Sequence, residues 1–201
     1  MAAEAATTLK NGDLIFQLQG AGALSDAIAR STASADSLKI VHVGIIEVTA
    51  SGEVNVIEAS SEEGVRVIPL SEFVAESPKI DGKPALIVKR LTLPFPASDA
   101  IFRAKAHLGE PYDWLYLPDN GAMYCSELVY DSYRDADGNP IFESEPMNFR
   151  ASDGTMPEFW VRLYSEAGID IPEGLPGTNP NSLSKHPSLI PVPSPFSSSS
   201  R

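Results

Sequence analysis

The stretch MYCSELVYDSY, residues 123–133, decides how the rest of the chain is interpreted. It contains the only cysteine, Cys125, followed at helical spacing by Leu128, Val129 and Tyr133, which predicts a helix that begins at the cysteine. A thiol in the first turn of a helix lies near unpaired backbone N–H groups and the positive end of the helix dipole, and both favour the nucleophilic thiolate. The alternative is a small buried hydrophobic side chain. A histidine elsewhere that can serve as the base of Cys125 would decide between the two.

Length and charge set bounds on the class of protein. The 201 residues, 43% of them hydrophobic, are enough for one domain with a proper core. The net charge of −12 repels phosphate backbones and anionic lipid surfaces, so we expect no nucleic-acid partner and no electrostatic attachment to a membrane. A single cysteine excludes a disulfide within the chain and leaves the redox compartment open.

Targeting segments are not evident in the sequence. No apolar run approaches about 18 residues, so no transmembrane segment is predicted. The first residues, MAAEAATTLKNGD, lack the basic and apolar regions of a signal peptide, which predicts a soluble protein without one. A signal removed ahead of this sequence would instead place the protein in the periplasm or outside the cell, so the localisation stays open, as does the oligomeric state.

Strand-like runs follow one another through the first half of the chain. They are residues 14–18, 40–48, 54–59, 65–68 and 85–91. The run IVHVGIIEV at 40–48 has the β-branched density of a central strand, and a turn at Ser51 and Gly52 makes it an antiparallel hairpin with the next run. Helical patterns come later in the chain. The sequence therefore predicts an α+β fold, with an antiparallel, partly barrel-like sheet of about five or six strands and the Cys125 helix packed against it.

The C-terminal part divides into a helix and a tail. Thr155 and Glu158 have the spacing of a capping box with Pro157 in the first turn, which predicts a helix beginning there. Residues 188–201 are rich in proline and serine and are expected to be extended or disordered. The predicted organisation is a single domain over residues 1–187 followed by this tail.

One of the three histidines interrupts an apolar strand. His186 lies in a polar segment near the C-terminus, and His107 lies near the end of a predicted helix, where an imidazolium can interact with the helix dipole. His42 is a polar residue within the apolar run at 40–48, on the opposite strand face from its neighbours. It is the candidate base for Cys125; the alternative is a buried neutral histidine satisfied by one backbone carbonyl.

A glutamate interrupts the following strand in the same way. Glu58 lies in VNVIEAS, and the hairpin places it near His42, where its carboxylate can accept the second ring N–H. Such a contact fixes the tautomer and stabilises the imidazolium, as the third member of a Cys–His–acid set does. The alternative is an outward-facing strand glutamate.

Other chemistries lack their sequence signatures. The cysteine and the two histidines outside the tail lie at scattered positions that do not match zinc-ligand spacing, so no metal and no other cofactor are expected. There is no phosphate loop, dinucleotide fingerprint or G-x-S-x-G elbow.

Four motifs in order resemble a known family. They are GDLIF at 12–16, VHVGIIE at 41–47, VIEAS at 56–60 and YCSELVYDSY at 124–133. The set resembles the permuted NlpC-type papain-like hydrolases, in particular the YiiX/YaeF-like branch. In unpermuted papain-like enzymes the cysteine precedes the histidine, whereas in this chain it follows. The resemblance implies a circularly permuted papain-like fold.

The same resemblance implies roles for particular residues. It makes Cys125 the nucleophile, His42 the base and Glu58 the third, polar member. Tyr124 and Tyr112 match aromatic positions near family active sites and are the candidate substrate-binding residues. The resemblance also implies that Gly12 and Asp13 are structural and that residues 177–187 pack near the cleft.

The activity implied by the resemblance is that of a cysteine peptidase or amidase without cofactor. Its candidate substrates are amide bonds of cell-wall-type peptides, γ-glutamyl or lysine-containing. Two alternatives stay open. The first is thiol-dependent lipid acyl hydrolysis or transfer of the lecithin:retinol acyltransferase-like type, and the second is a non-catalytic binding module on the same fold.

Overall fold

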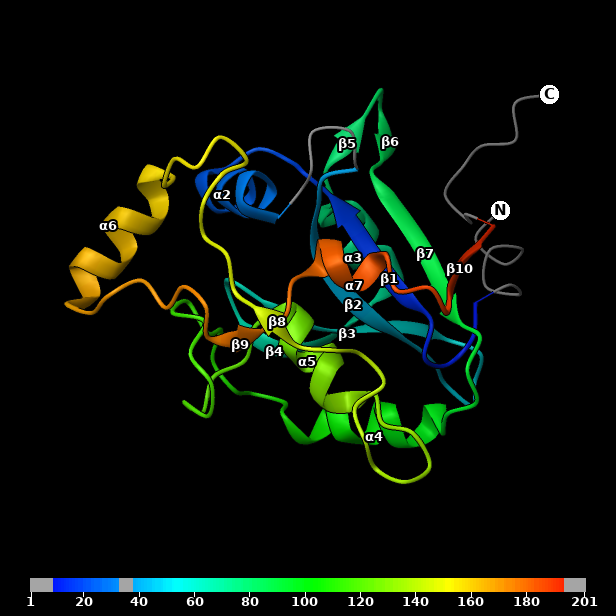
Figure 1. The fold of residues 1–201 in the computed structure, drawn as a ribbon. Helices are drawn as coiled ribbons and strands as arrows, with labels where there is room; N and C mark the ends of the chain where they lie inside the picture. Colours follow the sequence, from blue (N-terminus) through cyan, green and yellow to red (C-terminus); the bar gives the residue numbers. More distant parts are fainter. Residues whose placement is uncertain (1–8, 33–37, 194–201) are drawn as a thin grey trace.

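The centre of the molecule is a six-stranded antiparallel sheet (Figure 1). The computed structural model describes residues 9–32 and 38–193. The strand order is β10-β7-β1-β2-β3-β4, so β10 and β4 form two open edges and the sheet is not closed into a barrel. The strands are β1 (Leu14–Leu18), β2 (Ile40–Val48), β3 (Val54–Ser60), β4 (Gly64–Pro69), β7 (Leu86–Leu91) and β10 (Leu189–Val192). The predicted α+β class and antiparallel sheet are confirmed.

Both faces of the sheet are covered, as the apolar alternation of β2 shows. Val43 and Ile45 belong to the larger core, which includes the Cys125 helix, whereas Ile46 belongs to a second core on the opposite face. Successive residues of a strand point to opposite faces, so one apolar strand supplies both cores. Because both faces of β2 are buried, nearly all of its residues are apolar. A polar residue such as His42 within it is therefore a candidate functional residue.

Helices surround the sheet in Figure 1. They are α2 (Ala23–Thr32), α3 (Leu70–Glu76), α4 (Ala97–Ala106), α5 (Cys125–Ser132), α6 (Glu158–Ala167) and α7 (Pro180–Ser184). The cysteine helix α5 packs against β2, β3 and α4, and α7 packs against β2. Two short strand pairs complete the fold: β5 (Lys79–Ile80) with β6 (Lys83–Pro84), and β8 (Glu145–Pro146) with β9 (Pro176–Gly177).

The turn into β1 ties the sheet to the far end of α5. The hydroxyl of Tyr133 donates to the carbonyl oxygen of Gly12 at 2.9 Å. Asp13 is buried and accepts two hydrogen bonds from the Arg90 guanidinium, at 2.6 and 2.7 Å. The first contact joins the end of α5 to this turn and the second joins the turn to β7, which agrees with the structural role expected for Gly12 and Asp13.

The start of α6 corrects one prediction. The N-cap residue is Pro157, with no side-chain cap, so the predicted capping box of Thr155 and Glu158 does not form. The Thr155 hydroxyl and N–H both donate to Asp153, at 2.5 and 2.9 Å. The side chain that would have capped the helix is therefore engaged in the preceding turn. The helix ends at Gly168, which adopts the left-handed conformation.

The segment assigned to the C-terminal tail contributes a strand. Residues 189–192 form β10 on the edge of the sheet, where Leu189 and Val192 are buried. Pro191 is tolerated there because an edge strand leaves one row of backbone groups unpaired. The rest of the expected tail, residues 194–201, lies outside the described residues.

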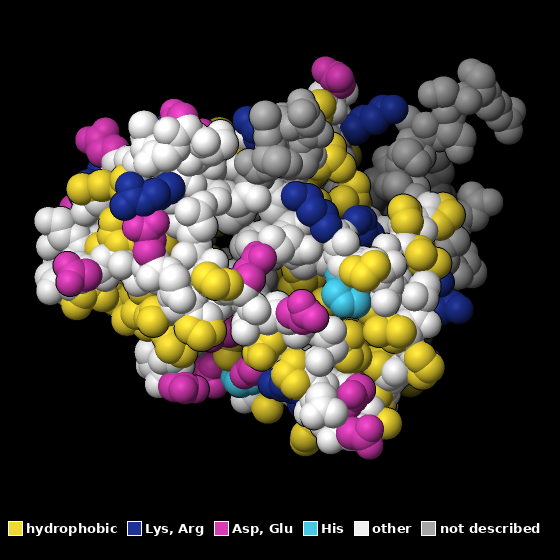
Figure 2. Space-filling model, in the orientation of Figure 1, with side chains coloured by type: hydrophobic (Ala, Val, Ile, Leu, Met, Phe, Trp, Pro, Cys, Tyr) yellow, Lys and Arg dark blue, Asp and Glu magenta, His cyan; other side chains and the backbone are white. Residues whose placement is uncertain are grey.

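Acidic side chains are dispersed over one face of the molecule. Figure 2 shows acidic side chains scattered over the face it presents rather than gathered in one patch. Across residues 9–32 and 38–193, no helix combines the length and hydropathy needed to cross a membrane.

Candidate active site

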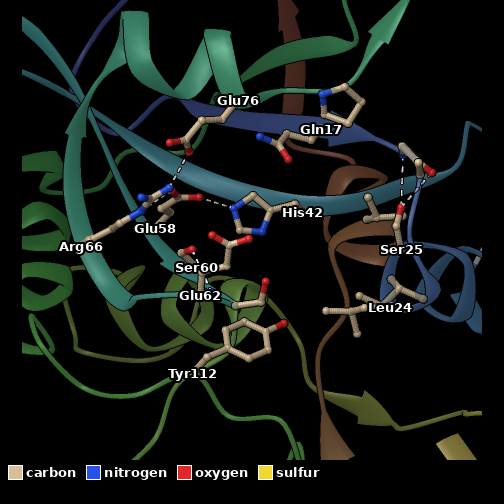
Figure 3. Close-up of a pocket in the computed structure, with 16 residues that line it drawn as sticks. Gln17, Leu24, Ser25, His42, Glu58, Ser60, Glu62, Arg66, Glu76 and Tyr112 are labelled. Atoms are coloured by element: carbon tan, nitrogen blue, oxygen red, sulfur yellow. Dashed lines mark hydrogen bonds and ion pairs between the residues drawn. The ribbon is translucent and has the colours of Figure 1, made fainter. Parts of the chain in front are cut away.

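The strand register brings the two predicted polar residues together. Ile45 pairs with Ile57 across β2 and β3. Continuing that register places Gly44 opposite Glu58 and makes His42 its diagonal neighbour, within reach of a long side chain. His42 Nε2 lies 2.5 Å from Glu58 Oε2, as Figure 3 shows. The predicted proximity of His42 and Glu58 is confirmed.

A third residue, absent from the sequence predictions, holds Glu58 from the other side. Arg66 lies directly opposite Glu58 on β4. Its Nε and Nη2 lie 2.9 and 2.7 Å from Glu58 Oε1, so the two carboxylate oxygens serve different partners. The same guanidinium contacts Glu76 at 2.7 Å and Glu63 at 3.2 Å. The signal in the sequence was the turn at 61–63, about which Glu58 and Arg66 are symmetrically placed.

Cys125 completes the group from the first residue of α5. Cys125 is 3% exposed, and it lies close enough to His42 to help raise the pKa of the imidazole. Since Nε2 of His42 faces Glu58, Nδ1 is the ring nitrogen left for the thiol. The helix begins after Tyr124, whose backbone N–H donates to Glu127 at 3.4 Å. The structure thus places the imidazole between a thiol and a carboxylate.

The electrostatics of the group favour an imidazolium. Burial alone would lower the pKa of His42, but the hydrogen bonds and negative charges of Cys125 and Glu58 raise that pKa to about 10. Burial would raise the pKa of Glu58, and the hydrogen bonds and charges of His42 and Arg66 outweigh it and lower that pKa. Glu58 is therefore an ionised carboxylate near neutral pH, with a cation on each side.

Aromatic rings support the imidazole and the cysteine. Phe73 on α3 stacks on the His42 ring, with centroids 6.1 Å apart and planes at 27°. Tyr112 is buried, and its hydroxyl lies 3.3 Å from that of Tyr116. Burial, together with Tyr116 and Cys125, raises the pKa of Tyr112, so its hydroxyl keeps a proton that it can donate. Phe73 and Tyr116 were not identified from the sequence.

Two cavities meet near the thiol. A polar groove of about 460 Å³ contains His42 and Glu58 (Figure 3). A small recess of about 40 Å³ contains Cys125 and has walls of aromatic side chains, with Tyr112 and Ile28 shared between the two spaces. The aromatic walls of the recess are Tyr112, Tyr116, Tyr124, Phe149 and Trp160. The polar groove and the apolar recess are therefore neighbours, and Cys125 lines the recess.

The C-terminal segment forms one wall of the recess. The Tyr124 hydroxyl accepts a hydrogen bond from the backbone N–H of Thr178 at 3.1 Å, and burial raises the pKa of Tyr124 to about 12. Thr178, Asn179 and Pro180 line the recess. Residues 177–187 were expected near the cleft, and Thr178 to Pro180 lie there.

The other histidines lie in different surroundings. His107 Nδ1 is 3.0 Å from Glu110, and the ring of His186 packs edge-on against Phe142. Within the described ranges, no group of three or more His, Cys, Asp or Glu residues could hold a metal ion.

The sheet and the order of its polar residues define a class of protein. The histidine strand precedes the cysteine helix on a papain-like core, so the arrangement is a permuted one. Residues 8–192 match the family described as permuted papain-like amidase enzymes, YaeF/YiiX, C92, and the chain belongs to this family.

Two relatives agree with this assignment. The chain is 28% identical over 186 residues to YiiX of Escherichia coli (strain K12), described as an uncharacterized protein, covering 91% of this chain and 85% of that protein. It also superimposes on a crystal structure described as metalloprotein yiiX from Escherichia coli O157:H7, with a TM-score of 0.74 and 25% identity. That match covers 94% of this chain and 99% of the other.

Proposed function

We propose that this protein is a cysteine amidase that hydrolyses amide bonds through Cys125, His42 and Glu58. The observation that carries the proposal is the position of His42, which lies 2.5 Å from the Glu58 carboxylate and near enough to Cys125 for the cysteine to help raise its pKa. Membership of the permuted papain-like amidase family supports the same class of reaction. A buried cysteine that served only in packing would need neither the His42 imidazole nor the Glu58 carboxylate beside it.

In the first half-reaction the Cys125 thiolate attacks the carbonyl carbon of the amide. The backbone N–H of Cys125, at the start of α5, donates to the developing oxyanion. The His42 imidazolium gives its proton to the leaving nitrogen, the carbon–nitrogen bond breaks, and an amine leaves. The product is a thioester between the acyl group and Cys125. The raised pKa of His42 supports this role, because it keeps the imidazole protonated near neutral pH.

In the second half-reaction His42 changes from acid to base. Acylation removes the thiolate, whose hydrogen bond and charge help to raise the pKa of His42, so that pKa falls. The neutral imidazole then takes a proton from water, which attacks the thioester carbonyl. The carbon–sulfur bond breaks, the carboxylic acid product leaves, and the Cys125 thiolate and the His42 imidazolium are restored. Glu58 stabilises the imidazolium each time it forms.

The proposed substrates are cell-wall-type peptides with γ-glutamyl or lysine-containing amide bonds. Tyr112 and Tyr124 are the proposed substrate-binding residues. Both line the recess beside Cys125, and Tyr112 also borders the polar groove. Their hydroxyls are protonated, because burial raises both pKa values.

The test is to incubate the protein with a panel of such peptides and to measure released amine. We expect turnover by the wild type, none by Cys125→Ala, and a large loss in His42→Gln. His107→Gln is the matched control, because it removes an imidazole that lies outside the site. Mass spectrometry should detect an acyl group on Cys125 during turnover. Absence of both amine release and the acyl adduct from the whole panel would contradict the proposal.

Ester substrates distinguish the lipid-acyl alternative. If fatty-acyl esters are cleaved through Cys125 and amides are not, Cys125 is still the nucleophile, but the proposed amide substrates are wrong. If neither reacts and Cys125 is inert to thiol reagents, a binding module becomes the better description.

A further inference from the structure

We infer that Arg66 is a positioning residue that holds Glu58 ionised and directs one of its oxygens at His42. The inference rests on the proposed function, because it assigns a further member to the same site. It extends the group of three residues to a line of four side chains: thiol, imidazole, carboxylate and guanidinium.

The geometry separates the two oxygens of Glu58. Oε2 faces His42 at 2.5 Å, while Oε1 receives Nε and Nη2 of Arg66 at 2.9 and 2.7 Å. Because each oxygen has its own partner, the carboxylate cannot rotate without breaking one of these charge-assisted contacts. The second oxygen is then fixed in the direction of the imidazole, which is what an orienting carboxylate requires.

Burial makes a second cation necessary. The Glu58 side chain is 4% exposed, and a buried carboxylate tends to take up a proton unless charged partners offset its desolvation. His42 cannot supply a constant charge, because its proton moves during the proposed reaction. Arg66 keeps its charge at every step. We therefore assign to Arg66 the permanent part of the stabilisation of Glu58.

Arg66 is itself held in place by carboxylates outside the pair. Glu76 at the end of α3 and Glu63 in the turn before β4 contact its Nη2 and Nη1 atoms. Both are largely exposed, so they orient the guanidinium without adding another buried charge. The remaining titratable groups around Glu58 are Glu62 and Tyr112 in the groove and Cys125 beyond His42.

The experiment measures the pH dependence of Cys125 alkylation by iodoacetamide, which needs no substrate. In Arg66→Met, Glu58 should take up a proton at higher pH, and the thiolate–imidazolium pair should fail there. We expect the acidic midpoint of the alkylation rate to move to higher pH, by at most the roughly 1–3 units that a neighbouring cation gives a carboxyl group, because the effect reaches the thiol through His42. Arg66→Lys should recover part of this shift, because it keeps the charge and loses the planar fork.

The control variant is Arg162→Met, which removes an exposed guanidinium that lies 3.9 Å from Glu166 on α6, and it should leave the midpoint unchanged. A double-mutant cycle separates positioning from general damage: in a Glu58→Gln background, Arg66→Met should add no further shift. Circular dichroism checks that each variant folds, and Arg66→Lys serves if Arg66→Met does not. A wild-type midpoint in the folded Arg66 variants overturns the inference and leaves the proposed function intact. If wild-type Cys125 reacts like a free thiol at every pH, both are overturned.

Discussion

Replacing Gly64 by alanine is expected to be one of the most damaging small substitutions in this chain. Gly64 opens β4 with a φ of +74°, and a Cβ atom there would lie 2.1 Å from the carbonyl oxygen of Glu110. The close approach is fixed by two backbone hydrogen bonds. Val65 N–H donates to Glu110, and Gly109 N–H donates to Val65, each at 2.9 Å. The clash is therefore with backbone that cannot rotate away.

The magnitude follows from two costs. A left-handed conformation costs a residue with a side chain about 1–2 kcal/mol. Overpacking against fixed atoms adds about 1–3 kcal/mol, so Gly64→Ala should lose about 2–5 kcal/mol of the free energy of unfolding. Gly52 is the matched control, because its φ is +86° and a Cβ there meets no atom within 4 Å. Gly52→Ala should lower the free energy of unfolding by the conformational cost alone, about 1–2 kcal/mol.

Urea unfolding followed by circular dichroism gives both values from the same assay. Equal losses at the two glycines would refute the reasoning, because they would show that the contact between the β3–β4 turn and the loop at Glu110 contributes nothing. An unfolded Gly64→Ala protein would agree with the larger cost.

Four further outcomes are expected. Glu58→Gln should keep the fold and reduce kcat, because a neutral amide stabilises the His42 imidazolium poorly; equal kcat values would leave a Cys–His dyad. Alkylation of Cys125 should lower the pKa of His42 from about 10 toward its unperturbed 6.5, as NMR titration of the ring can show, because the thiolate is one cause of the raised value; an unchanged pKa would contradict this. Because the pKa of His42 is higher in the native state than in the unfolded chain, protonation of His42 stabilises the native state fully below about pH 6.5, and this stabilisation is lost as the pH rises toward 10. Between pH 6.5 and 10 the alkylated protein should therefore lose less stability than the unmodified protein. Ser31→Ala should cost about 1–3 kcal/mol in urea unfolding, because it leaves the buried Trp160 N–H without the acceptor it now has at 3.0 Å; a cost near zero would mean that water replaces the hydroxyl.

Local sequence patterns predicted most of the fold. The strand β2 and the helix α5 lie where the spacing of apolar residues predicted them. A strand buried on both faces is apolar throughout, and a helix buried along one stripe is apolar at every third or fourth residue, so both patterns can be recognised in the sequence. The sequence predictions were wrong where a neighbouring side chain offers a different hydrogen-bond partner or where the position of a strand in the sheet matters. Asp153 takes both donors of Thr155, so the expected cap of α6 is lost. Pro191 reads as a strand breaker, yet an edge position accommodates it.

The candidate site divides in the same way. Cys125, His42 and Glu58 are recognisable from the sequence, since each is a reactive or polar side chain where apolar residues are expected. Arg66 is not, because in an edge strand an arginine between two valines has the alternation of an ordinary solvent-facing side chain. Its role depends on the register with β3. The aromatic recess also escapes prediction, because distant segments of the chain supply its walls.

The sequence distances within the site bear on how the protein folds. His42 and Glu58 are 16 residues apart, and Glu58 and Arg66 are 8 apart, whereas Cys125 enters from a helix far along the chain. Contacts between near neighbours cost less loop entropy and form sooner than distant ones. We therefore expect the imidazole, carboxylate and guanidinium to assemble first, on a meander that leaves the ribosome before the cysteine helix. In the proposed mechanism the thiol gains its base only when that helix docks, so we expect a nascent chain to carry no activated nucleophile before this step.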